Sequence, residues 1–462
     1  MTELVDRITL EQWDSRYEEL RAAGLMEPAY GGPLRRHVDE GGDRRLLRLM
    51  FDPSPAALRL WNFLLTEEER LHAARARGDV IVGAMKDLGT VPVMAYSLPN
   101  VVAFYPDGAW WIPCVMEMSA GLLAVADSLG LDESFCPVRA MVGAFATRAH
   151  FPIPDLLICS VGATCDDFSS IAQRLEGMGH PILWWEIPAR RPTEPGEDAV
   201  DLPGLYAAPA GQVEFVRREL ERVRAALESA AGTRLDSDML RAGIRVANEI
   251  RRVLGELRRL AYAAEPCPIP ALEMQIAEML AIHFCSDRGE CLAVLNDLLD
   301  ECRERVKNGV GVMPANAARV FWVNPVADIK VMNLLEECGA RVCGTEYLFC
   351  HALDEIPEDV ELLEALARAA LADPMVGPAA ERAARICRDA VKFGAEAVLV
   401  SRIPGASHCA TEGAVINDIV GARLGLPVAE IEIPPITDSM QPTIATRIQA
   451  LVEIVMQRRT KK

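Results

Sequence analysis

The sequence lacks the short motifs by which several large enzyme classes are recognised. It contains no GxxxxGK[ST], no GxGxxG after a predicted strand and no GxSxG, which disfavours P-loop ATP hydrolysis, dinucleotide-dependent dehydrogenation and α/β-hydrolase chemistry. No apolar stretch approaches the roughly 18 residues of a membrane-spanning helix. The acidic, amphipathic N-terminus also lacks the basic and apolar regions of a secretion signal. We therefore expect a cytoplasmic protein with no membrane contact.

Positive charge is also in short supply. The 462 residues include 48 Lys and Arg against 67 Asp and Glu, a formal net charge of -19. Proteins that bind nucleic acid or anionic membranes present a basic face, so this balance argues against both partners. Half of the residues are hydrophobic and a quarter are charged, as in globular proteins. At roughly 150 residues per domain, the length suggests about three domains.

Cysteine spacing excludes a further group of sites. The chain has 13 cysteines but no CxxC pair, so zinc ribbons and bacterial-ferredoxin runs do not fit. In a cytoplasmic protein the thiols stay reduced, and most can serve as small buried hydrophobic side chains. A subset could instead bind a soft metal or an iron–sulfur cluster. Such a cluster would need ligands that are far apart in the sequence.

Strand and helix patterns alternate in two separate parts of the chain. Short apolar runs followed by amphipathic segments predict strand–helix–strand units, with strongly helical patterns before and between them. Residues 92–98 also read as a strand. The economical fold is an α/β protein with two units joined by a helical segment. We predict a helical N-terminal region at 1–90, a first α/β lobe at 91–210, a helical connector at 211–315 and a second α/β lobe at 316–462.

Three cysteines lie at or just before the start of a predicted helix. Cys136 precedes Pro137, and proline is favoured in the first turn of a helix. Cys165 precedes two aspartates of the capping type, and Cys409 follows a strand and a glycine-containing loop. Apolar residues at helical spacing follow each of the three. Two of the three cysteines, Cys165 and Cys409, also lie beyond the end of a predicted parallel-type strand.

This location favours metal chemistry. A helix N-terminus carries partial positive charge and free N–H donors, which lower the pKa of a thiol and can bond to cluster sulfides. Ligands of open α/β sheets bind at the carboxyl ends of the strands. Three thiolates from two lobes could hold a four-iron cluster whose fourth iron stays open to a substrate oxygen. On spacing alone, buried cysteines without a metal are the alternative.

Longer stretches of the chain resemble one family, in order along the sequence. The chain is similar to the D-component family of 2-hydroxyacyl-CoA dehydratases and to the related cluster-bearing subunits of ATP-dependent benzoyl-CoA reductase. The matching stretches, between about residues 90 and 457, are FCPVRAMVGAF, PIPDLLICSVGATCDDFSSIAQRLEGMGHP, LRAGIRVANEIRRVLGELR, ARVFWVNPVADIKVMNLLEECGARV and RLGLPVAEIEIPPITDSMQPTIATRIQALVEIV.

The resemblance implies a fold, a cofactor and partners. It implies two flavodoxin-like lobes, with a [4Fe-4S] cluster between them on Cys136, Cys165 and Cys409. An ATP-hydrolysing activator donates a low-potential electron to such a cluster, which passes it to the thioester carbonyl of an acyl-CoA or aryl-CoA substrate. The resulting ketyl radical anion expels a neighbouring hydroxyl or, on an aromatic ring, accepts protons and a second electron. The resemblance further implies a heterodimer with a paralogous cluster-bearing chain.

A fourth cysteine leaves a larger cofactor open. Cys350 stands where some relatives, including those with a double-cubane [8Fe-9S] cluster, also have a cysteine. With Cys338 and Cys343 it could serve such a cluster, and packing in the core is the alternative. Two other functions therefore stand beside the first: a double-cubane reductase of small molecules, and a cluster-less paralogue that binds acyl-CoA or a partner chain.

Acid–base and phosphate-binding groups are less strongly marked. His408, in the loop of the third cysteine, and His150, near a strand of the first lobe, could act as acid–base groups, and Glu412 could act near the iron. The plain alternatives are solvated histidines and a carboxylate favoured by the helix dipole. Arg190 and Arg191 could receive CoA phosphates or form a solvated charge pair.

Overall fold

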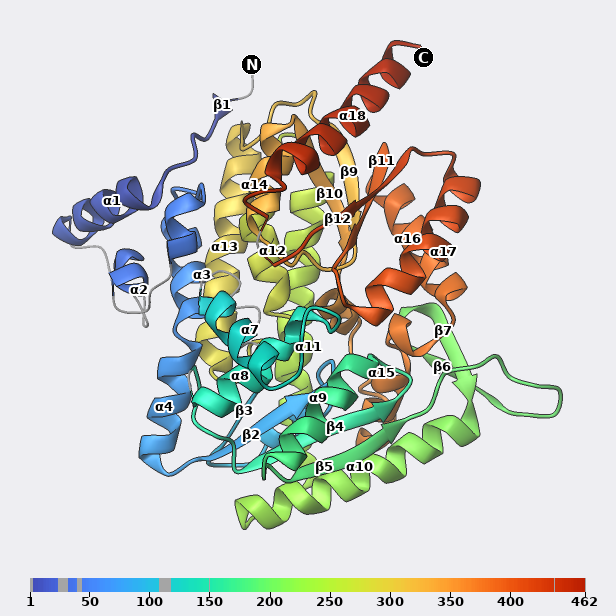
Figure 1. Ribbon diagram of the computed structural model, residues 1–462. Coiled ribbons are helices and arrows are strands. Elements are labelled where there is room, and N and C mark those ends of the chain that lie inside the picture. The colour runs from blue at the N-terminus through green and yellow to red at the C-terminus, as the bar shows by residue number, and fades with distance from the viewer. Residues whose placement is uncertain are drawn as a thin grey trace.

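Two α/β lobes pack against a shared set of long helices, here called the scaffold helices (Figure 1). The structure, a computed structural model, describes residues 3–23, 32–39, 44–107, 118–148, 150–435 and 437–461, and within these it leaves the side chains of residues 118–120, 348, 349 and 407–411 undescribed. In Figure 1 the first lobe occupies the lower half of the molecule and the second lobe the upper right.

Each lobe is built on a four-stranded, fully parallel sheet, and the two sheets share one strand order. The order is β3-β2-β4-β5 in the first lobe and β10-β9-β11-β12 in the second. Numbered within its own lobe, each sheet reads 2-1-3-4, the order with which a flavodoxin-like sheet begins. The strands are Val80–Met85 (β2), Val101–Phe104 (β3), Leu156–Gly162 (β4), Ile182–Ile187 (β5), Ala318–Val323 (β9), Ala340–Glu346 (β10), Ala397–Arg402 (β11) and Val428–Glu432 (β12).

The connections between the strands also match. In the first lobe the three crossovers contain α5, then α7, η2 and α8, then α9; in the second they contain α14, then η4, α15, η5 and α16, then α17. After the last strand, α10 packs against β5 and α18 against β12. The bounds are Val91–Tyr96 (α5), Met118–Ser128 (α7), Pro137–Arg139 (η2), Ala140–Thr147 (α8), Asp166–Gly177 (α9), Ala210–Ala231 (α10), Lys330–Glu337 (α14), Leu348–Leu353 (η4), Leu362–Leu371 (α15), Pro374–Val376 (η5), Ala379–Lys392 (α16), Ser407–Leu424 (α17) and Gln441–Thr460 (α18).

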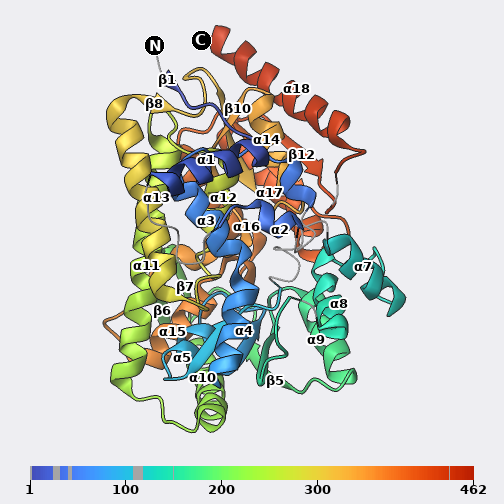
Figure 2. The same cartoon turned by 90° about the vertical axis from the view of Figure 1, so that its left-hand side faces the viewer.

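The scaffold helices join the two lobes. α11 contacts α5 of the first lobe and both β10 and α15 of the second, and α13 packs along α11. Figure 2 shows this pair running along one side of the molecule. α12 is buried along its whole length, so it belongs to the common core. The bounds are Leu10–Ala22 (α1), Arg35–Asp39 (α2), Arg44–Arg48 (η1), Pro55–Leu65 (α3), Glu67–Arg77 (α4), Ser237–Ala263 (α11), Ala271–Met279 (α12) and Arg288–Asn308 (α13).

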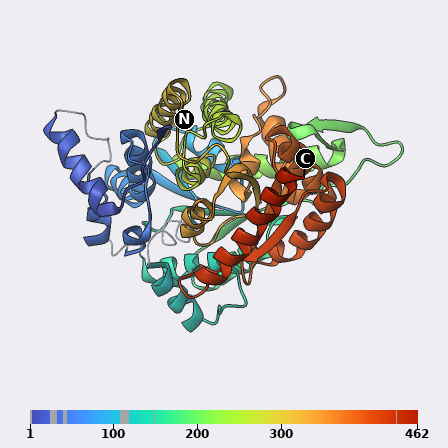
Figure 3. The ribbon, with the colours of Figure 1, turned by 90° about the horizontal axis from the view of Figure 1, so that it is seen from above.

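Two small sheets lie outside the lobes. β1 (Glu3–Leu4) pairs with β8 (Val310–Gly311), and β6 (Ala199–Leu202) forms an antiparallel hairpin with β7 (Tyr206–Pro209). Seen from above, α1 and this hairpin lie at opposite sides of the molecule (Figure 3). Among the described residues, no helix is both long enough and apolar enough to cross a membrane.

The structure differs from the sequence-based boundaries at β2. This strand lies inside the region expected to be helical at 1–90, yet it is a central strand of the first sheet, so the first lobe begins near residue 80 rather than 91. A local signal for the boundary exists. Gly78 adopts the left-handed conformation that ends α4, directly before the strand.

Most of the segment expected to be a strand at 92–98 is instead helix α5. The Asp87 carboxylate accepts hydrogen bonds from the N–H groups of Thr90 and Val91, at 2.8 and 2.7 Å, and so satisfies the free donors of a helix start. Pro92 in the first turn supplies the helical φ. These end effects outweigh the strand-like composition of a segment only six residues long.

Candidate functional site

The carboxyl edges of the two sheets present the same geometry. Flavodoxin-like sheets bind ligands at this edge, at the switch point where the strand order reverses between the first and third strands of the lobe. These strands are β2 and β4 in the first lobe and β9 and β11 in the second. Met85 pairs with Cys159 in the one and Val323 with Val400 in the other, so both switch points have the same register.

The residue that follows the first strand of each lobe has an unusual backbone conformation. Lys86 and Asn324 have positive φ angles of 57° and 69°, which residues other than glycine rarely adopt. A serine on the third strand holds each of them: Ser160 Oγ donates to the carbonyl oxygen of Lys86, and Ser401 Oγ to that of Asn324 at 3.1 Å. All four residues are buried. Strain of this kind, held by its surroundings, is concentrated at functional sites.

Cys165 is the N-cap of α9, the helix that follows β4. Gly162, at the end of β4, has a φ of 114°, and a Cβ there would collide with the carbonyl oxygen of Ile187, so the turn requires glycine. Asp166 and Asp167 form the first turn of the helix, where the dipole favours carboxylates. The half-buried thiol donates to Oδ2 of Asp167 at 3.5 Å. The predicted helix start at Cys165 is confirmed.

Cys136 also lies at a helix start, as predicted. It is the buried N-cap of η2, which continues as α8, and Pro137 is the first residue of the turn. The Arg139 guanidinium donates back to the carbonyl oxygen of Phe135 at 3.1 Å and closes the turn. Both η2 and α8 contact α9, so the two segments that Cys136 and Cys165 begin pack against each other.

The second lobe repeats this turn with a different cap. η5 occupies the position in its crossover that η2 occupies in the first lobe. Its N-cap is Asp373, and Pro374 is its first residue. The place held by Cys136 in the first lobe is therefore held by a carboxylate in the second.

A loop of the second lobe reaches the helix starts of the first. Gly405, between β11 and α17, has a φ of 77°, and a Cβ there would collide with the carbonyl oxygen of Phe135, the residue before Cys136. α17 itself contacts α9. Cys409 is the third residue of α17, and its side chain and that of His408 lie outside the described side chains. The backbone thus places the loop before α17 against the start of η2, and α9 contacts both η2 and α17 at this junction between the lobes.

This junction suits a thiolate-bound metal better than an oxygen-bound ion. Cys136 and Cys165 supply soft sulfur donors, and the N–H groups of the helix starts can donate to an anionic group. Among the side chains that the structure describes, no three of His, Cys, Asp or Glu are grouped so as to hold a metal ion. Because the side chain of Cys409 is not among them, the three-cysteine site stays a prediction.

Cys350 lies in a different environment, and the structure does not bring it together with Cys338. Its sulfur accepts a hydrogen bond from Arg258 Nη1 at 3.3 Å. Burial, with Glu278 nearby, raises the pKa of Cys350 to about 12, so the thiol is neutral at pH 7. Cys338 precedes β10, Cys343 lies within it and Cys350 follows it, and a seven-residue strand is roughly 20 Å long. A metal-binding role for Cys350 stays a prediction.

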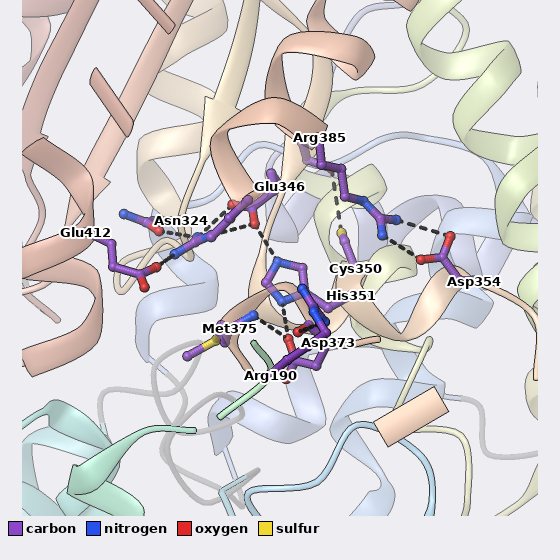
Figure 4. A network of polar contacts seen from close by, with 12 residues as sticks. Arg190, Asn324, Glu346, Cys350, His351, Asp354, Asp373, Met375, Arg385 and Glu412 are labelled. Atoms are coloured by element: carbon purple, nitrogen blue, oxygen red, sulfur yellow. Dashed lines mark hydrogen bonds and ion pairs between the residues drawn. The ribbon is translucent and has the colours of Figure 1, made fainter. Parts of the chain in front are cut away.

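A buried network of charges lies at the switch point of the second lobe (Figure 4). Glu346, the last residue of β10, accepts two hydrogen bonds from Arg382 of α16, each at 2.7 Å. Its Oε1 also lies 2.5 Å from Nε2 of His351, whose Nδ1 lies 2.9 Å from Asp373. Arg382 further donates to Oδ1 of Asn324 at 2.6 Å. All five residues are buried, so the charges of the network stabilise one another rather than being solvated.

The same arginine reaches the start of α17. Its Nη1 donates to Oε2 of Glu412 at 2.8 Å, one helical turn after Cys409. This contact joins the start of α17, which carries the predicted ligand Cys409, to the network at the carboxyl end of β10. The role of Glu412 near an iron stays a prediction, and its ion pair with Arg382 gives it a structural role in addition.

His150 lies at the far end of α8 from Cys136. It follows Arg148, the C-cap of the helix, and has a φ of 74°. The η2–α8 segment separates the two residues by roughly 15–20 Å of helix. Burial lowers the pKa of His150, and the described residues offer its Nε2 no hydrogen-bond partner. An acid–base role for His150 stays a prediction that this placement does not favour.

Arg190 of the first lobe forms buried contacts with the second lobe. It is buried, and its guanidinium donates to the carbonyl oxygen of Leu371 and to Glu381 Oε2, the latter at 3.0 Å. Arg191 is partly exposed and forms a two-point ion pair with Glu197. Of the two arginines considered for phosphate binding, the first therefore holds the lobes together.

A small polar cavity lies between the lobes. Its walls include Lys86 and Thr164 of the first lobe, His351 and Asp373 of the second, and Arg251 of α11. Its volume of about 30 Å³ has room for a water molecule or two but not for an acyl chain. The cavity is therefore a solvent-sized space beside the junction rather than a substrate pocket.

The stability of the protein should depend on pH through His351. Burial alone would lower the pKa of this histidine, but Glu346 and Asp373 outweigh it and raise the pKa above 6.5. Such a group stabilises the fold fully below its unfolded pKa and loses that contribution as the pH rises through its folded pKa. We expect the melting temperature of the wild type to fall more steeply above pH 6.5 than that of His351→Gln. Thermal melts between about pH 6 and 9 measure both slopes, and parallel slopes would contradict the expectation.

Sequence reasoning missed Lys86 and the network around Arg382. One signal was available, because Lys86, Asn324 and Glu346 stand at the carboxyl ends of buried strands, where polar residues indicate a ligand edge. Arg382 and His351 carry no such mark. In sequence, an arginine on a helix and a histidine in a loop are typical of solvated positions.

Comparison with known families gives one match. A sequence model described as 2-hydroxyglutaryl-CoA dehydratase, D-component, matches residues 93–455. The matched range includes both lobes except β2, the whole connector and all three helix starts of the junction. No curated protein matches the chain.

Proposed function

Since the chain belongs to the 2-hydroxyglutaryl-CoA dehydratase D-component family, we propose that it is the cluster-bearing subunit of a 2-hydroxyacyl-CoA dehydratase or of a related aryl-CoA reductase. The observation that carries the proposal is the meeting of η2, α9 and α17 at the junction of the lobes. Each of these segments begins with, or within three residues of, a cysteine.

Cys136, Cys165 and Cys409 would hold a [4Fe-4S] cluster in this proposal. When bound, the cluster would supply a low-potential electron to the thioester carbonyl of an acyl-CoA or aryl-CoA. The protein contributes rigid ligands, because Gly162 and Gly405 fix two of the turns by direct backbone contact. The close approach of Gly405 to Phe135 also holds a loop of the second lobe against the residue before Cys136.

Two partner proteins belong to the proposal. The sequence has no P-loop motif, so ATP hydrolysis would be supplied by a separate activator protein that delivers the electron. A paralogous cluster-bearing chain would complete the enzyme as a heterodimer. Both partners follow from the family and stay part of the proposal.

Iron and acid-labile sulfide analysis of protein purified without oxygen tests the proposal. About four irons per chain are expected, and a paramagnetic signal should appear after addition of the activator, ATP and a reductant. About eight irons per chain would instead favour the double-cubane reductase. Folded protein that contains no iron after strictly anoxic purification would contradict both and leave the cluster-less paralogue.

A further inference from the structure

Lys86 is a buried cation with few partners. It follows β2 at the switch point of the first lobe, and only 8% of its surface is exposed. Its ammonium donates to Ser169 Oγ of α9 at 3.1 Å, and no carboxylate among the described residues forms an ion pair with it. A buried charge without an opposite charge destabilises a protein, so an anionic partner would stabilise buried Lys86.

The acidic groups around Lys86 do not supply that partner. Burial raises the pKa of the nearby Cys159 thiol to about 12, so it is neutral at pH 7. Asp166, which also lies near Lys86, is exposed to solvent. Asp87 follows Lys86 in the chain, but its carboxylate accepts hydrogen bonds from the start of α5. Burial lowers the pKa of Lys86 and outweighs the opposing effect of Cys159, Cys165 and Asp166, so these groups compensate the charge of the ammonium only in part.

In the part of the second lobe that the structure describes, the position equivalent to Lys86 carries no cation. The neutral Asn324 stands at the position that corresponds to Lys86. The nearest guanidinium, that of Arg382, is shared between Glu346 and Glu412, so its charge is compensated.

A second buried cation, Arg251 of α11, lines the cavity beside Lys86, and its guanidinium donates to the carbonyl oxygen of Ala352 and to Asn248. Of these two cations, Lys86 is the one bonded to the helix that Cys165 begins.

We propose that Lys86 is a positioning residue for the cluster: its ammonium, anchored on α9 through Ser169, compensates the negative charge of the thiolate-bound cluster beside Cys165 and raises its reduction potential. The proposal rests on the proposed function. Reduction adds one negative charge to the cluster, and a nearby cation stabilises that form more than the oxidised form. Screening is weak at a buried site, so the effect persists at physiological salt.

Redox titration of the cluster, followed by its paramagnetic signal, tests this role. Lys86→Met keeps an unbranched side chain one heavy atom shorter and removes the charge, so we expect full iron content and a midpoint potential more negative than that of the wild type. Lys86→Arg should restore most of the difference. The matched control is Lys330→Met. Lys330 is the first residue of α14, is partly exposed and pairs with Asp438, so loss of its charge should leave the potential unchanged.

The outcomes separate this proposal from the proposed function. Wild-type protein without iron contradicts the proposed function itself. An unchanged potential in iron-replete Lys86→Met, or an equal shift in Lys330→Met, overturns the role of Lys86 and leaves the cluster in place. Ser169→Ala keeps the charge and frees the ammonium, so a smaller shift in the same direction supports the proposal. Loss of iron in Lys86→Met, with thermal melts that show the variant to be folded, contradicts the expected full iron content and overturns a role of Lys86 in the potential.

Discussion

Cys165→Ser protein, purified without oxygen, is expected to contain almost no iron and to have lost the visible absorption of the cluster. Serine oxygen is a hard ligand that seldom replaces thiolate on iron–sulfur clusters. Cys165 caps α9 in a turn that Gly162 fixes. Cys159, the cysteine nearest to it in the sequence, cannot replace it, because Cys159 is a neutral, buried thiol on β4. Activity with the partner chain and the activator should fall to background with the iron.

Cys159→Ala is the matched control for this experiment. It removes the cysteine closest in sequence to Cys165, from the same strand–helix unit, and should retain full iron because its thiol is buried in the core. The same measurement on Cys136→Ser and Cys409→Ser extends the test. Wild-type iron content in Cys409→Ser would show that the third ligand is wrongly assigned.

Arg382→Met should destabilise the fold by about 3–5 kcal/mol, the range found when one partner of a buried ion pair is removed. Its guanidinium makes four hydrogen bonds, two to Glu346 and one each to Asn324 and Glu412. Methionine leaves both carboxylates without their main partner at sites shielded from water. Urea unfolding of the wild type and the variant measures the difference in the free energy of unfolding.

Arg388→Met controls for the loss of an arginine from the same helix. Arg388 is exposed, and its guanidinium contacts the carbonyl oxygen of Gly204 at 3.3 Å, so its replacement should change stability by less than about 0.5 kcal/mol. Combining Arg382→Met with Glu346→Gln should cost less than the sum of the two single changes, since the amide needs no cation. Strict additivity would mean that the two side chains do not stabilise one another.

Local end signals account for what the sequence predicted at the junction. Cys136 and Cys165 are at helix starts because a proline or a pair of aspartates follows them, and such signals act over three or four residues. The α/β fold class is confirmed for the same reason, since alternating buried strands and amphipathic helices are local patterns.

Features that depend on distant pairing could not be predicted in this way. The sequence pattern does not separate β2 from the helical region predicted at 1–90. An apolar run of six residues is identified as a strand only by its pairing with β3 and β4. The network around Arg382 joins Asn324 and Glu346, which are 58 and 36 residues away in the sequence. No periodicity records such a contact, and a single sequence offers no other trace of it.

The repeated architecture of the lobes has an evolutionary consequence. The two halves share strand order and switch-point register, the pattern that duplication and fusion of a single-lobe ancestor would leave behind. A symmetric ancestor would present four equivalent helix starts at the junction. In this chain cysteine stands at or near three of them, and Asp373, bonded to His351, stands at the fourth. A vacant coordination site on a four-iron cluster would then be a product of divergence between two once identical halves.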